Sequence, residues 1–62
     1  LAIIRTITGH ADTVGIALDN LGLDVVLGTV AGDDTVLVVL RDGTGSEEFV
    51  QQLNERIPEL GV

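Results

Sequence analysis

The sequence predicts an α+β fold: a two-layer sandwich in which a small antiparallel sheet carries two helices on one face. Three observations support this prediction. Three short runs are apolar and rich in β-branched residues, two segments place apolar residues at helical spacing, and the order along the chain is β-α-β-β-α. Because 62 residues suffice for one small domain, we expect a single domain over 1–62.

The first half of the chain predicts a strand and then a helix. The segment LAIIRT, residues 1–6, is short and apolar, as a strand should be. Thr8 is the expected N-cap of the helix and Gly22 its C-terminal stop. Between them, one helical stripe consists of Ala11, Val14, Ala17, Leu18 and Leu21.

The second half predicts two strands, over residues 23–31 and 35–40, joined by the tripeptide GDD. The turn cluster RDGTG follows. Ser46 is the expected cap of a last helix, which Pro58 ends. The apolar face of that helix consists of Phe49, Val50, Leu53 and Ile57.

The predicted strands are apolar on both faces. A strand with one solvated face alternates apolar and polar residues, yet the runs VVL and VLVVL do not alternate. Two helices can cover only one face of the sheet. We therefore expect a partner subunit or further residues to cover the second face, and we favour self-association, because a bare face would exceed the apolar patch usual for monomers.

Composition narrows the classes of partner. Three Arg, no Lys and ten acidic residues give a net charge of −7, which disfavours nucleic acid and suits a cationic ligand. The chain has no cysteine, which fits a reducing compartment, and no apolar run near the roughly 20 residues that span a membrane. We expect a cytoplasmic location. Since the chain opens on Leu1 rather than Met, we expect a fragment of a longer protein.

The adjacent acids Asp33 and Asp34 lie between the two most apolar runs, and three interpretations are open. They are ordinary hairpin-turn residues, or a metal site like the GDD hairpin of viral RNA polymerases, or acceptors for a cation such as a planar guanidinium. The polymerase likeness covers three residues of a much longer fold. An enzyme is not expected, because no Ser, Cys or Lys sits in a nucleophile arrangement and the lone His10, expected to be exposed at the helix start, has no obvious partner.

The segment GTVAGDDT, residues 28–35, resembles the signature of the C-terminal domain of bacterial arginine repressors. The preceding segment agrees with it, since Thr6, Gly9, Ala11 and Asp19 stand at matching spacing. The resemblance extends from residue 1 to about residue 40, and the final helix matches in type and position. It implies a domain of a transcriptional repressor of arginine metabolism that senses L-arginine as co-repressor and assembles trimers and hexamers, with no other cofactor and no metal.

The resemblance also implies ligand-binding residues. Asp33 and Asp34 would receive the guanidinium of an L-arginine held mainly by another subunit, at the interface between trimers. Asp19, Thr29 and Ala31 would hold the amino and carboxylate end of the ligand. No catalytic residue is implied. Two alternatives stay open: a structural oligomerisation domain without a ligand, and a metal-binding acid-pair domain.

The sequence departs from the family pattern at several positions. Asp12 stands where the family often has Gln or His against the ligand, and a carboxylate there would repel the ligand's own carboxylate, which lowers affinity or favours a related cationic amino acid. Gly15 replaces a usual Ala, which weakens the helix by up to about 1 kcal/mol. The family's first strand and its DNA-binding winged helix are absent from this sequence. We therefore expect contact with operator DNA only through that N-terminal domain.

Overall fold

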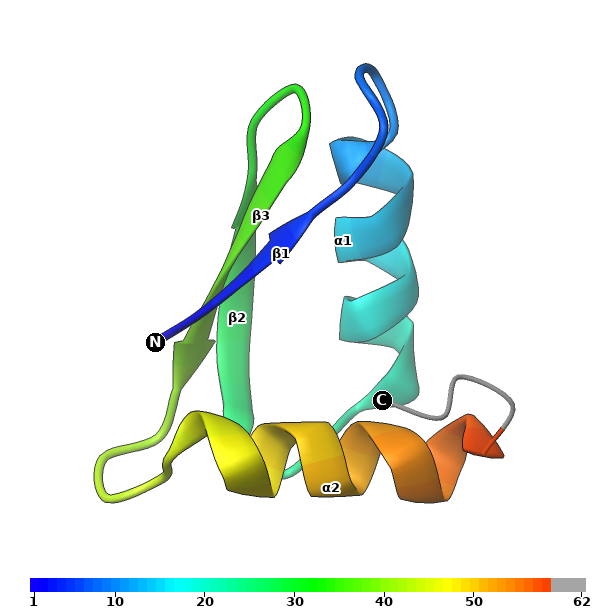
Figure 1. Ribbon diagram of the computed structural model, residues 1–62. Coiled ribbons are helices and arrows are strands. Elements are labelled where there is room, and N and C mark those ends of the chain that lie inside the picture. The colour runs from blue at the N-terminus through cyan, green and yellow to red at the C-terminus, as the bar shows by residue number, and fades with distance from the viewer. Residues whose placement is uncertain (59–62) are drawn as a thin grey trace.

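The computed structural model describes residues 1–58 and contains the predicted order of elements, while 59–62 of the predicted domain lie outside the described residues. The elements are β1 (Ala2–Arg5), α1 (Ala11–Leu21), β2 (Val26–Ala31), β3 (Thr35–Leu40) and α2 (Ser46–Arg56). Figure 1 shows α1 beside the sheet and α2 across one end of it. The predicted α+β sandwich with antiparallel strands is confirmed.

The sheet has the order β1-β3-β2, and both strand pairs are antiparallel. The register pairs Arg5 with Thr35 at one end and Ala2 with Val38 toward the other. A register shift between Val26 and Gly28 interrupts the pairing of β2 with β3. Because β3 is central, its first residue, Thr35, lies next to the last residue of β1, Arg5. The turn of the β2–β3 hairpin therefore lies beside the end of β1.

The core lies between the sheet and the two helices. Alternate side chains of β3 point inward, and Val36 and Val38 are fully buried. The remaining buried apolar side chains come from both helices, the loop before β2 and the end of β3, namely Ala11, Leu18, Leu23, Leu40, Phe49 and Leu53. Both helices therefore contribute buried apolar side chains to this one core.

Two expected N-caps were wrong. Helix α1 begins one residue after His10, which is its N-cap and makes no side-chain capping hydrogen bond, so Thr8 lies outside the helix. Helix α2 begins at Ser46 itself, with Gly45 as N-cap. The expected stop at Gly22 is confirmed, since this glycine has φ +62° and its N–H donates to the Asp19 carbonyl.

The opposite face of the sheet is open and apolar. Ile3 of β1 and Leu27 and Val30 of β2 are 65%, 59% and 61% exposed. Three large apolar side chains thus lie in water on the sheet face that the helices do not cover. In the part of the chain that the structure describes, no helix is long and apolar enough to cross a membrane.

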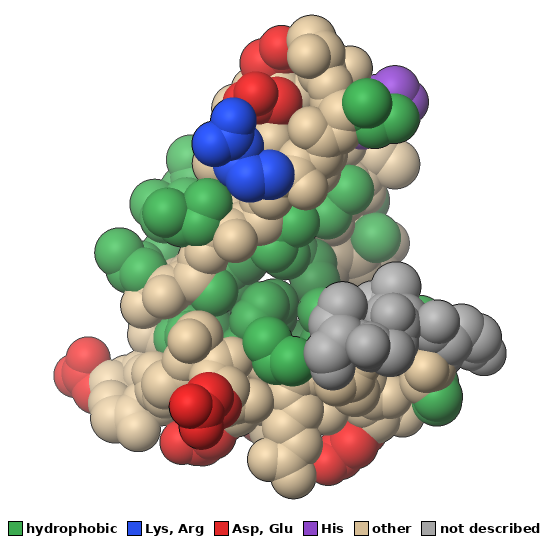
Figure 2. Space-filling model, viewed as in Figure 1, with side chains coloured by type: hydrophobic (Ala, Val, Ile, Leu, Met, Phe, Trp, Pro, Cys, Tyr) green, Lys and Arg blue, Asp and Glu red, His purple; other side chains and the backbone are tan. Residues whose placement is uncertain are grey.

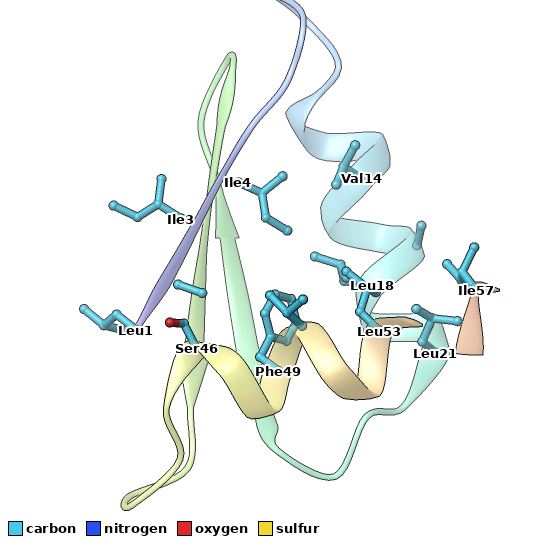
Figure 3. A pocket seen from close by; sticks show the side chains of 13 residues that line it. Leu1, Ile3, Ile4, Val14, Leu18, Leu21, Ser46, Phe49, Leu53 and Ile57 are labelled. Atoms are coloured by element: carbon cyan, nitrogen blue, oxygen red, sulfur yellow. The ribbon is translucent and has the colours of Figure 1, made fainter. Parts of the chain in front are cut away.

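An apolar groove of about 740 Å³ lies between β1, α1 and α2. Figure 2 shows hydrophobic side chains gathered in this hollow, and Figure 3 shows Ile4 on the side of β1 that faces α1, while Ile3, which also lines the groove, projects from the other side of the strand. Among the described residues that line it, Ser46 is the one with a polar side chain. The described residues that line the groove include no charged side chain that would bind a cation or a carboxylate.

Candidate functional site

The tip of the β2–β3 hairpin is fastened to the loop between β1 and α1. The backbone N–H of Thr6 donates to the Asp34 carbonyl at 2.7 Å, and that of Gly9 donates to the Asp33 carbonyl at 2.9 Å. A longer bond of 3.4 Å joins the Ala11 N–H to the same Asp33 carbonyl. A hairpin tip is usually mobile, but these bonds hold the two acids in place against the start of α1.

The two carboxylates at the tip have different surroundings. One oxygen of Asp34 (Oδ1) accepts a hydrogen bond from the Thr35 hydroxyl at 2.9 Å, and the other (Oδ2) lies 3.4 Å from the guanidinium of Arg5. Among the described residues, the exposed Asp33 carboxylate makes no hydrogen bond or ion pair. One member of the pair is therefore already bound by a guanidinium, and the other is free.

A second cluster lies where α1 crosses β2. The Thr29 hydroxyl donates to a carboxylate oxygen of Asp19 at 3.2 Å. A methyl group built on Gly15 would lie 3.5 Å from that hydroxyl oxygen and 3.6 Å from the Ala31 methyl carbon. The small residue at position 15 lets the helix approach the strand closely, so that Asp19 and Thr29 meet.

The structure therefore brings some of the predicted ligand residues together and leaves others apart. Asp19, Thr29 and Ala31 gather at the α1–β2 crossing, and Asp33 and Asp34 lie together at the hairpin tip. Asp33 and Asp34 are neighbours in the chain, whereas Asp19 and Thr29 meet because α1 packs against β2. No described hydrogen bond joins the two groups. The assigned ligand roles of all these residues stay predictions.

Asp12 is exposed in the first turn of α1, and no described contact joins it to either group. Its predicted effect on ligand affinity stays a prediction. His10 is exposed at the helix start, as expected, with its Nδ1 3.2 Å from the Thr8 carbonyl oxygen.

Arg5 was missed as a site residue. It reaches Asp34 because the register pairs Arg5 with Thr35, the first residue of β3, which directly follows Asp34 in the chain. The two residues are 29 positions apart in the chain, and no local spacing rule connects them. The available signal was that Arg5 ends the first predicted strand and Asp34 precedes the third, so that antiparallel neighbours would place them at the same edge.

No group of three His, Cys, Asp or Glu side chains that could hold a metal ion occurs within residues 1–58. The acid pair offers two carboxylates, one of them engaged by Arg5. What the site can do chemically is accept hydrogen bonds from a cation at a fixed hairpin tip. The fold and the site thus define a small α+β domain that displays a pair of carboxylates at its surface.

The particular family follows from comparison with known proteins. The model of the arginine repressor C-terminal domain matches residues 1–55, and the chain belongs to this family. An arginine repressor of Bacteroides thetaiotaomicron is 40% identical over 60 residues, which are 97% of this chain and 38% of that protein. One from Staphylococcus epidermidis is 46% identical over 49 residues, 79% of this chain and 33% of the relative.

A third arginine repressor, from Geobacillus kaustophilus, is 42% identical over 53 residues, 86% of this chain and 36% of that protein. The chain thus spans between 33% and 38% of the length of these relatives. The relatives carry the name of a repressor, which is a regulatory protein rather than an enzyme. The family match also reaches beyond residue 40 into α2, where the resemblance read from the sequence gave only type and position.

Proposed function

We propose that the domain binds L-arginine and assembles subunits of a transcriptional repressor that controls arginine metabolism. The observation that carries this proposal is the pair Asp33 and Asp34, held at a hairpin tip by backbone bonds to the loop before α1. Carboxylates in fixed positions suit a guanidinium, because its donors form a rigid planar fork. Membership of the arginine repressor family supports arginine as the source of that guanidinium.

The ligand's other end is assigned to the second cluster. Asp19 is acidic and accepts a bond from Thr29, so it suits the α-amino group, while the Thr29 hydroxyl and the backbone near Ala31 suit the carboxylate. The proposed arrangement uses two subunits: one subunit holds the ligand, and the acid pair of the other subunit receives the guanidinium of that ligand. The open apolar sheet face supports assembly, because Ile3, Leu27 and Val30 are exposed.

The same proposal places the repressor in the cytoplasm and gives contact with operator DNA to its N-terminal domain. The net charge of −7 argues against DNA contact by this domain itself. We expect no shift of operator DNA by this chain at physiological salt. A salt-sensitive, sequence-specific complex with this chain alone would contradict that expectation.

Calorimetric titration with L-arginine, citrulline and Mg²⁺ tests the function. We expect L-arginine to bind and citrulline to be rejected, because citrulline replaces the charged guanidinium by a neutral urea group. Binding of Mg²⁺ alone would favour the metal-binding alternative. If none of the three binds, a structural oligomerisation domain without a ligand would remain.

The acid pair is tested by Asp33→Asn, which keeps the shape of the side chain and removes its charge. A hydrogen bond to a charged group contributes roughly 1.5–3 kcal/mol, so L-arginine affinity should fall by about one to two decades. The fold should survive, since Asp33 makes no side-chain bond among the described residues. Asp42→Asn removes the same charge from an exposed turn and serves as the control. Equal affinities for wild type and Asp33→Asn would remove the acid pair from the binding site.

A further inference from the structure

We propose that Arg56 is a positioning residue for the ligand: from the end of α2 it holds the last turn of α1, whose Asp19 is assigned the ligand's α-amino group. The inference rests on the proposed function and deepens it, because it names what keeps the amino end of that site in place. Nη1 of Arg56 donates to the Leu21 carbonyl oxygen at 2.6 Å, across 35 positions of sequence. Arg56 thus acts through α1 and not on the ligand itself.

The end of α1 takes its donor from another helix. The last four carbonyls of a helix have no partner within it, and a basic side chain of the same last turn often supplies one. The last turn of α1 contains no basic residue, whereas that of α2 contains Arg56. Figure 1 shows this end of α1 reaching the level of α2. Arg56 therefore supplies both a donor and the positive charge that the negative end of the helix dipole favours.

A second arginine fastens the other side of the same connection, which leads from α1 to β2. Nε of Arg41 donates to the Asp24 carbonyl oxygen, and its backbone N–H donates to the Val25 carbonyl oxygen at 2.9 Å. Because Arg41 directly follows β3, these bonds tie the start of β2 to the sheet. The sheet thus holds the β2 side of the connection, and Arg56 holds the α1 side.

The bond from Arg56 bears on the amino end of the site. Asp19 stands two residues before Leu21 in the same last turn, and its carboxylate accepts the Thr29 hydroxyl at 3.2 Å. The Asp19 backbone carbonyl accepts the Gly22 N–H, also at 3.2 Å. Helix ends fray when their terminal groups lack partners. Release of Leu21 should therefore loosen this turn and shift the Asp19 carboxylate from its position beside Thr29.

The guanidinium end of the site should be insensitive to Arg56. Asp33 and Asp34 are fastened to the loop before α1, at the other end of that helix. An α-helix rises about 1.5 Å per residue, so the 11 residues of α1 separate its two ends by about 16 Å. Loss of Arg56 should weaken contacts to the α-amino group and spare contacts to the guanidinium, a selective effect that general destabilisation would not produce.

The test compares calorimetric affinities for L-arginine and for 5-guanidinopentanoate, which is arginine without its α-amino group. Arg56→Met keeps the length and helix propensity of the side chain and removes its donors and charge. We expect it to weaken L-arginine binding about three- to tenfold, as loss of one ordinary hydrogen bond does, and binding of the analogue less than about twofold. Arg56→Lys restores a donor and the charge, so L-arginine affinity should return to about the wild-type value. In the Asp19→Asn background, Arg56→Met should no longer discriminate between the two ligands.

Net charge does not explain the expected selectivity. Arg56→Met makes the protein more negative, which favours the cationic L-arginine over the neutral analogue, so the charge effect has the opposite sign. The matched control is Arg41→Met, which removes the same charge and a bond to the β2 side of the same connection. We expect this control to keep the wild-type ratio of the two affinities. An equal change of the ratio in both variants, or an equal weakening of both ligands by Arg56→Met, overturns the role of Arg56.

Hydrogen exchange of the Gly22 amide, followed by NMR, is a readout that needs no ligand. Because this N–H closes the last turn of α1, we expect faster exchange in Arg56→Met than in the wild type, and wild-type exchange in Arg56→Lys. Unchanged exchange in Arg56→Met overturns the proposal whatever the ligand does. A wild type that binds no L-arginine removes the proposed function instead, and the effect of Arg56 on ligand binding with it.

Discussion

Gly15 lies where α1 packs against β2, next to the pair formed by Asp19 and Thr29. The position does not require a glycine. A methyl group there would stand 3.5 Å from the Thr29 hydroxyl oxygen and 3.6 Å from the Ala31 methyl carbon, which is ordinary van der Waals contact. Glycine costs roughly 1 kcal/mol relative to alanine inside a helix.

Gly15→Ala should therefore raise the free energy of unfolding by about 0.5–1 kcal/mol, measured by urea denaturation at fixed protein concentration. Gly22→Ala is the matched control. Gly22 has φ +62°, a left-handed conformation that costs an L-residue about 1–2 kcal/mol, so this variant should be less stable. A loss of stability in Gly15→Ala would mean that the contact with Thr29 and Ala31 cannot accept the methyl group.

We expect Asp12 to affect stability and binding of the proposed ligand in opposite directions. It lies in the first turn of α1, where a negative charge stabilises the helix dipole by about 0.3–1 kcal/mol. A carboxylate would repel the ligand's carboxylate at that position. Asp12→Gln should thus lose a few tenths of a kcal/mol of stability while it binds L-arginine a few-fold more tightly.

Calorimetric titration beside thermal melts checks both effects of Asp12→Gln. Asp42→Asn, which removes a charge from an exposed turn remote from α1, controls for the change in net charge. Unchanged affinity would separate Asp12 from the ligand.

At the scale of elements, the sequence predicted the order, the number of elements and the inward face of each helix, because hydrophobic periodicity carries this information. The bounds of β3 and the stop of α1 at Gly22 agree with the structure. The start of β2 does not agree, since the strand begins at Val26 rather than Leu23. A turn precedes the strand, in which the Val26 N–H donates to the Leu23 carbonyl. The apolar residues of this turn have the sequence pattern of a strand.

What could not be predicted depends on register. The contact of Arg5 with Asp34 and the backbone bonds that hold the hairpin tip join segments far apart in sequence. The register between β1 and β3 decides which of their residues face each other. Because the strands are apolar on both faces, the sequence pattern is compatible with more than one register.

The central strand carries the core, so a truncation there should be the most damaging within the sheet. Val38 is fully buried, and Val38→Ala removes two methyl groups' worth of burial and leaves a cavity, for an expected loss of about 2–3 kcal/mol. Val39→Ala, on the opposite face of the same strand, is half-buried and should cost less than about 1 kcal/mol. Urea denaturation compares the two, and equal losses would mean that the outer face is also covered in the assembled protein.

Within residues 1–58, the helices cover one face of the sheet and leave the other face open. A domain of this size buries only about 60% of its unfolded surface, so association is a common way to gain stability. Exposed apolar side chains on β1 and β2 give this face the composition of an interface. The apolar pattern of the strands predicted it, because strands with solvent on one side would have alternated.

Val30→Arg tests whether the open sheet face joins subunits. Val30 is 61% exposed on β2, so the isolated fold should tolerate the long side chain, whereas an interface that buries this position would have to desolvate an unpaired charge. We expect the mass measured by light scattering across a dilution series to fall toward the monomer. Because Arg reduces the net charge of −7, general repulsion between subunits cannot account for such dissociation. Gln51→Arg, at an exposed position of α2, adds the same charge and should leave the mass unchanged. Circular dichroism of both variants separates dissociation from unfolding, and a Val30→Arg protein that keeps the wild-type mass would place the subunit contacts elsewhere on the molecule.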